Sequence, residues 1–181
     1  GTGSTGTQPS ECTRMKNSTV QALISIVVIL LVACMLSWAG SQGGESALGI
    51  PVFALCGLVS FGINWAIFIP SYVAQTEHYF DLTGTVTYLS LMVVALGASA
   101  SIDPRSVLIL ALVSVWALRL GSFLFRRIRE DGSDGRFDRI KPNFARFWMA
   151  WTLQGLWVFL TLSCALAAMT SAFQIDLGGW A

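Results

Sequence analysis

Long apolar runs alternate with short polar segments from residue 19 onward. Each run is close to the roughly 20 residues that cross the hydrocarbon core of a bilayer. A backbone in lipid must satisfy its own hydrogen bonds, so each run is predicted to be a helix. The pattern predicts an all-α membrane protein, a bundle of about five transmembrane helices at residues 19–40, 48–70, 83–100, 106–125 and 147–170.

The first fourteen residues, GTGSTGTQPSECTR, are polar and show no apolar periodicity. We expect residues 1–14 to be disordered or non-native, and residues 15–181 to form the transmembrane bundle. Met15-Lys16 followed by an apolar run also resembles a signal peptide. The run continues past Cys34 and exceeds the roughly 7–15 residues of a signal core, which favours a retained helix over a cleaved signal.

Composition agrees with lipid as the solvent. Of the 181 residues, 54% are hydrophobic and only 12% are charged, against about 25% charged in soluble domains. The net charge of +1 gives no support for nucleic acid as a partner. The four cysteines form no CxxC pair, so neither a disulfide framework nor a zinc site is indicated.

Basic residues predict the orientation of the bundle. Seven of the eleven Lys and Arg residues lie in the segment 126–146, and Arg14 and Lys16 precede the first span. An even number of crossings separates these two groups, so both can be cytoplasmic. We therefore expect a multi-pass protein with the 126–146 loop in the cytoplasm and the two termini on opposite sides.

Arg119 lies within the fourth apolar run, six residues before its end. At 1.5 Å per residue it is about 9 Å inside the apolar limit. Its long side chain could snorkel to the interface. Alternatively, Trp116 and Phe123 lie on the same helix face, and that face could line a polar cavity inside the bundle. For the orientation of the side chain we predict the inward position.

The segment QTEHYFD, residues 75–81, gathers Glu77, the only histidine, Tyr79 and Asp81 after the second run. A buried Glu can titrate near neutrality, and an acid beside a phenol could deliver a proton during a reduction. An ordinary interfacial loop has the same composition, and spacing alone favours that reading. Glu77 and Tyr79 are the catalytic candidates that this segment offers.

The polar loop RRIREDGSDGRFDR, residues 126–139, mixes basic residues with acids and glycines. A positive-inside anchor explains the basic residues but not the acids or the glycines. Arginines on such a loop can hold phosphate groups. No GxGxxG or P-loop is present, so a nucleotide would bind among membrane helices. The candidate cofactor ligands here are Arg127, Asp134, Arg136 and Asp138.

Three stretches together resemble a family. TEHYFDLTGTVTYLS, DPRSVLILALVSVWALRLGSFLFRRIREDGSDGRFDRIK and FWMAWTLQGLWVFL are similar to bacterial membrane proteins that are grouped with the steroid 5α-reductases. The similarity runs from about residue 48 to residue 170. It implies a bacterial inner-membrane, NADPH-dependent reductase in a helical bundle open to membrane lipids, acting on a hydrophobic lipid-like or steroid-like enone.

The same resemblance implies roles for particular residues. Arg119 corresponds to an arginine on the cofactor side, and Glu77 is the candidate acid. Where the family carries a tyrosine one turn before that arginine, this chain has Trp116, so Tyr79 or Tyr88 would have to replace it. The family continues with a further segment and helices that complete the cofactor pocket, so we expect this chain to be the N-terminal portion, with weak NADPH binding at most.

A non-catalytic polytopic protein, such as a transporter fragment or a scaffold, is the alternative function. A transporter is expected to show repeated, interrupted helices in two halves, and this symmetry is not recognisable in the sequence. The topology also predicts that the Glu77 segment and the 126–146 loop meet at one membrane face.

Overall fold

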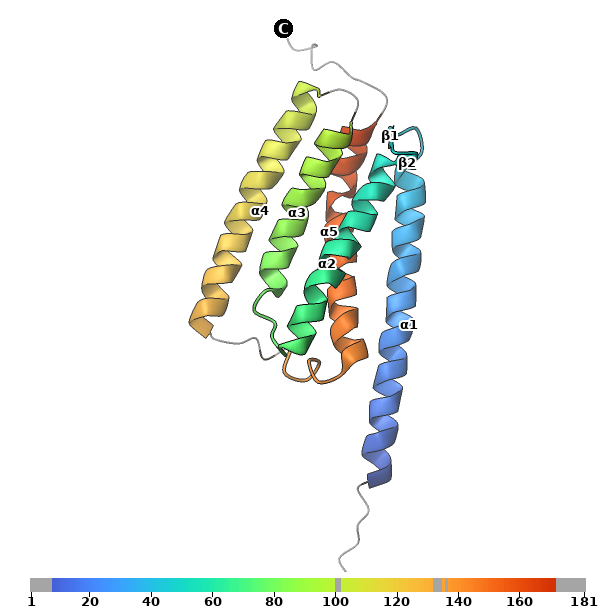
Figure 1. Ribbon diagram of the computed structural model, residues 1–181, viewed down its shortest axis with the longest axis vertical. Helices are drawn as coiled ribbons and strands as arrows, with labels where there is room; N and C mark the ends of the chain where they lie inside the picture. The colour runs from blue at the N-terminus through green and yellow to red at the C-terminus, as the bar shows by residue number, and fades with distance from the viewer. Residues whose placement is uncertain (1–7, 100–101, 132–134, 136, 172–181) are drawn as a thin grey trace, which may run out of the picture.

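A computed structural model describes residues 8–99, 102–131, 135 and 137–171. Five long helices lie side by side, with α4 at one edge of the bundle and α1 at the other (Figure 1). They are α1 (Gln8–Gly40), α2 (Val52–Val73), α3 (Phe80–Ala98), α4 (Pro104–Asp131) and α5 (Phe144–Thr170). All five contain a stretch that is long and apolar enough to cross a membrane. The predicted all-α bundle is confirmed.

The first helix begins earlier than the apolar pattern indicated. α1 starts at Gln8, so residues 8–14, which we expected to be disordered, have helical backbone. Residues 1–7 lie outside the described part of the chain. The stretch of α1 that suits a membrane is Lys16–Gly40. A helix can continue past the apolar limit because its backbone hydrogen bonds are internal.

A short hairpin joins α1 to α2. Its strands are β1 (Ser46–Ala47) and β2 (Ile50–Pro51), which pair antiparallel. The two turn residues, Leu48 and Gly49, both have positive φ, at 56° and 78°, as a two-residue hairpin turn of the primed type requires. This hairpin lies at the opposite end of the bundle from the α2–α3 connection (Figure 1).

Helix α5 lies at the centre and packs against α1, α2 and α3, whereas α4 packs mainly against α3. Close approach of α2 and α5 depends on small residues. Ser60 Oγ donates to the Gly155 carbonyl at 2.7 Å, and a Cβ added at Gly155 would lie 3.1 Å from the Phe61 ring. Small residues let helix backbones approach in membranes, where contact between side chains replaces the hydrophobic effect.

Two amides in the apolar runs form hydrogen bonds between helices. Asn64 Nδ2 of α2 donates to Thr87 Oγ1 of α3 at 3.3 Å. Gln154 Nε2 of α5 donates to the Phe80 carbonyl at 2.8 Å. This is the role that single amides usually have in membrane helices. Together they fix α3 between α2 and α5.

An aromatic cluster closes the end of the bundle where the polar loop lies. Its buried members are Phe68 of α2, Phe137 of the loop, and Phe147 and Trp151 of α5. The Phe137 ring centroid is 4.9 Å from that of Phe80. The polar loop is thus anchored on the core by an aromatic side chain.

Candidate functional site

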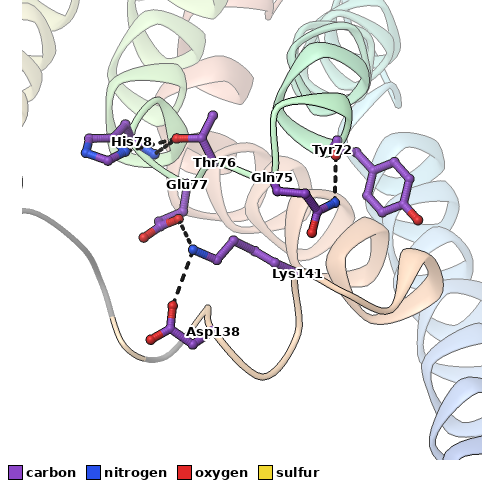
Figure 2. A network of polar contacts seen from close by, with 7 residues as sticks. All are labelled: Tyr72, Gln75, Thr76, Glu77, His78, Asp138 and Lys141. Atoms are coloured by element: carbon purple, nitrogen blue, oxygen red, sulfur yellow. Dashed lines mark hydrogen bonds and ion pairs between the residues drawn. The ribbon is translucent and has the colours of Figure 1, made fainter.

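The α2–α3 connection meets the polar loop at one end of the bundle. Lys141 Nζ lies 2.6 Å from Glu77 Oε2 and 3.3 Å from Asp138 Oδ1. Figure 2 shows the Lys141 side chain extending between the two carboxylates. The Glu77 side chain is 2% exposed, that of Lys141 16%, and that of Asp138 61%. The prediction that these two segments meet at one end is confirmed.

The N-terminal side of α1 belongs to this same end. Asn143 Nδ2 donates to Thr19 Oγ1 of α1 at 2.9 Å. The Asn143 side chain also caps α5, because its Oδ1 accepts the Arg146 backbone N–H at 3.1 Å. The start of the first span and the described end of the polar loop therefore lie at the same end of the bundle, as the orientation argument requires.

The ion pair changes the proton affinity of Lys141. The hydrogen bond to Glu77 raises the pKa of Lys141 above its ordinary value, and the hydrogen bond to Asp138 adds to this. Both acids favour the charged ammonium, and this outweighs the opposing effect of burial. Lys141 is therefore held as a cation that donates a hydrogen bond to Glu77.

His78 and Tyr79 face away from this ion pair. His78 Nδ1 is 2.9 Å from Thr76 Oγ1, and Figure 2 shows the imidazole on the far side of the segment from Lys141. Tyr79 is 54% exposed and lines a groove between α2 and α3. The structure thus does not bring Tyr79 together with Glu77 in the shared site that the sequence suggested.

Arg127 lies at the end of α4, where its Nη2 is 4.0 Å from Asp81 Oδ2. The two side chains are 43% and 26% exposed. This pair joins the end of α4 to the start of α3, at the end of the bundle where the polar loop lies. Asp134 and Arg136, the other two predicted cofactor ligands, lie outside the described residues.

The predicted inward position of Arg119 is wrong. Arg119 is exposed on the outer side of α4, and Phe123 is 63% exposed. Trp116 is 47% exposed and places its ring edge-on to Tyr88, with centroids 5.0 Å apart. The common face of these residues was identified correctly. That face is uncovered because α4 packs mainly against α3.

A second groove, of about 490 Å³, runs between α3, α4 and α5. Its walls are mostly apolar, and its polar groups are Asp81, Thr85, Tyr88 and Gln154. Tyr88 Oη is 2.8 Å from Thr161 Oγ1. Thr161 Oγ1 also donates to the Trp157 carbonyl at 2.8 Å. Either hydroxyl can be the donor in the Tyr88–Thr161 hydrogen bond.

Sequence reasoning missed two features of this end of the molecule. Lys141 was counted among the loop's basic residues, but no spacing pointed to Glu77, which is 64 residues away. Tyr88 was considered only as a substitute for a tyrosine that the family carries. Its burial in an apolar run was the available signal, since a buried phenol normally finds a hydrogen-bond partner.

Five apolar helices and interhelical hydrogen bonds between single amides and hydroxyls define a polytopic membrane protein. Within this class, the chain belongs to the DUF1295 family, a family of proteins of unknown function, whose model matches residues 67–181. That match includes the end of α2, the ion-paired connection, and helices α3 to α5. Comparisons with curated proteins and with solved structures found no match.

Proposed function

We propose that this chain forms part of a membrane-embedded, NADPH-dependent reductase that acts on a lipid-like or steroid-like enone. The groove between α3, α4 and α5 is the observation that carries the proposal. Its volume of about 490 Å³ is within the range of about 300–1,000 Å³ that small-molecule sites occupy. Mostly apolar walls with a few polar groups suit a hydrophobic molecule with one carbonyl.

The resemblance to steroid 5α-reductases supports the reaction type. Reduction of an enone needs a hydride at the β-carbon and a proton at the carbonyl oxygen or the carbon next to it. NADPH supplies the hydride when it is bound. The protein must hold the enone in an apolar site and donate the proton. Tyr88 is our candidate for the second task because it is one of the polar residues that line the groove, and its hydroxyl forms a hydrogen bond with Thr161.

Glu77 is less suited to proton delivery than the sequence indicated. A general acid must carry a proton, but the Glu77 carboxylate accepts a hydrogen bond from Lys141 at 2.6 Å. We infer that Glu77 positions the polar loop and that Tyr88 is the acid. Tyr79, the other phenol in this part of the chain, lines the separate α2–α3 groove.

The arginines at the end of α4 fit the phosphate groups of a dinucleotide. Arg126, Arg127 and Arg129 are all exposed there, and guanidinium groups bind phosphates with two parallel hydrogen bonds. Arg126 and Arg127 would hold the cofactor. Arg119 lies eight residues before Arg127, about 12 Å away along the helix axis. It would contribute only if the cofactor extends along α4.

The experiment compares two tyrosine variants of the full-length protein in membranes that carry it. NADPH oxidation is followed with a 3-oxo-4-ene steroid and with a linear isoprenoid enone. Tyr88→Phe is expected to lower kcat by about 10²-fold or more, the range for loss of a general acid. Tyr79→Phe, the matched control, should keep wild-type kcat. Equal activity of both variants would remove Tyr88 from the mechanism, and no enone-dependent oxidation by the wild-type protein would reject the reductase.

A further inference from the structure

The groove between α2 and α3 is separate from the proposed reductase site. Its volume is about 430 Å³. The α3 wall reaches the outside of the bundle, because Leu82 is 38% and Val86 46% exposed. The α2 wall carries Ile63, Ile67 and Ser71. In a membrane such an opening faces lipid, so any occupant enters sideways from the bilayer.

Ser71, which lines this groove, and the carbonyl one turn before Pro70 both lack their usual hydrogen-bond partners. Ser71 is 2% exposed, and its Oγ makes no hydrogen bond to any described residue. Pro70 lies inside α2 and has no N–H to donate to the carbonyl of Ala66, one turn earlier. Ala66 lies three residues after Ile63 and four before Pro70, so it shares their helix face. A buried hydroxyl without a partner is costly in an apolar setting.

We propose that this groove binds a neutral glycerolipid of the membrane. The glycerol hydroxyl would accept a hydrogen bond from Ser71 and donate one to the Ala66 carbonyl, and an acyl chain would lie along Ile63, Ile67 and Val86. The Ser71 side chain would have to turn its hydroxyl toward the ligand. One ligand hydroxyl would then pair both with Ser71 and with the carbonyl that Pro70 deprives of its usual N–H donor.

Depth and charge both favour this class of lipid. Ser71 is two residues from the end of α2, about 3 Å along the helix, which is the level where glycerol lies beneath the headgroups. Ile63 is eight residues deeper, about 12 Å, among the acyl chains. The described residues that line the groove include no charged side chain. A fatty acid or an anionic headgroup would therefore have no counter-ion there.

The test uses a diacylglycerol with a photoactivatable diazirine in one acyl chain and the protein reconstituted in phosphatidylcholine vesicles. We expect saturable labelling of α2 and α3 that unlabelled diacylglycerol displaces. Val86→Trp fills the groove and should reduce the labelling several-fold. Val93→Trp is the matched control, because Val93 lies two turns further along α3 and is 63% exposed to lipid.

Ser71→Ala separates a ligand-binding serine from a structural one. Loss of one hydrogen bond should raise the half-saturating lipid concentration about two- to tenfold. Because Ser71 Oγ has no hydrogen-bond partner among the described residues, the melting temperature without added diacylglycerol should not fall. Labelling spread over the outer faces of α1 and α4 without saturation would overturn the proposal. So would equal labelling of the two tryptophan variants, or displacement by oleate as effective as that by diacylglycerol.

Discussion

The Lys141 ammonium lies 2.6 Å from the buried Glu77 carboxylate and joins two connections that are 64 residues apart in the chain. Glu77 follows α2, and Lys141 lies three residues before α5 begins. One ion pair therefore ties the α2–α3 connection to the polar loop, at the same end of the bundle as the Arg127–Asp81 pair. Because the Glu77 side chain is buried, we expect this ion pair to contribute more to stability than an exposed one.

Replacing Lys141 should destabilise the protein more than replacing its second partner. Lys141→Met leaves the buried Glu77 carboxylate without this cation and should cost about 3 kcal/mol, near the lower end for breaking a buried pair. Asp138→Asn, the matched control, removes a partner that is 61% exposed and should cost less than about 1 kcal/mol. Thermal unfolding in detergent measures both variants, and equal losses would mean that burial does not decide the strength of this network.

The raised pKa of Lys141 predicts how stability depends on pH. A cation whose pKa is higher in the folded protein contributes stability that is complete below its unfolded pKa, about 10.4, and is lost as pH rises through the folded value. The stability difference between wild type and Lys141→Met should therefore stay constant from pH 7 to about 9.5 and shrink above about 10.4. Unfolding of both proteins across this range measures it, and a difference that grows with pH would contradict the assigned sign.

The number of spans and the meeting of the two polar segments were predictable from sequence. Lipid selects long apolar runs, and counting crossings places every second connection at the same end. The orientation of Arg119 was not predictable. Periodicity shows which residues share a helix face with Arg119, but not whether a neighbouring helix covers that face. The Glu77–Lys141 pair was not predictable from the local sequence either, because it depends on how the polar loop folds back over the aromatic cluster.

Close packing of α3 and α4 depends on Gly121. A Cβ at this position would overlap the Thr85 side chain, a short and β-branched neighbour that cannot move aside. Gly121→Ala should therefore lower stability by about 1–3 kcal/mol, as overpacking does, and widen the α3–α4 contact beside the proposed substrate groove. Gly62→Ala, where nothing lies within 4 Å of the added Cβ, should be neutral or stabilising by up to about 1 kcal/mol. Melting temperatures of the two variants compare them directly.

The orientation of the bundle can be measured by labelling two exposed positions. Gly135 is exposed in the polar loop, and Leu48 is 98% exposed in the hairpin at the other end. In a background with the native cysteines replaced, Gly135→Cys should react with a membrane-impermeant maleimide only after permeabilisation, because the positive-inside rule predicts that the basic loop faces the cytoplasm. Leu48→Cys should react in intact cells. The reverse pattern would place the basic loop outside.

The last prediction concerns the arginines of α4 and the proposed cofactor. Arg127 is at the cytoplasmic end of α4 in our orientation, beside Asp81, whereas Arg119 is about 12 Å further along the span. Arg127→Ala should weaken NADPH binding about tenfold, the effect of losing one charge-assisted hydrogen bond of about 1.5 kcal/mol. Arg119→Ala should weaken it less.

Two further measurements separate a phosphate contact from a general loss of structure. The Arg127→Ala effect should diminish as salt rises, since ions screen exposed charges over about 8 Å at physiological ionic strength. Stability should change by less than about 1 kcal/mol, because the Arg127–Asp81 pair is exposed and its atoms are 4.0 Å apart. Cofactor fluorescence titrations at low and high salt test this. A salt-independent loss, or a larger effect at Arg119, would place the phosphates elsewhere than at the end of α4.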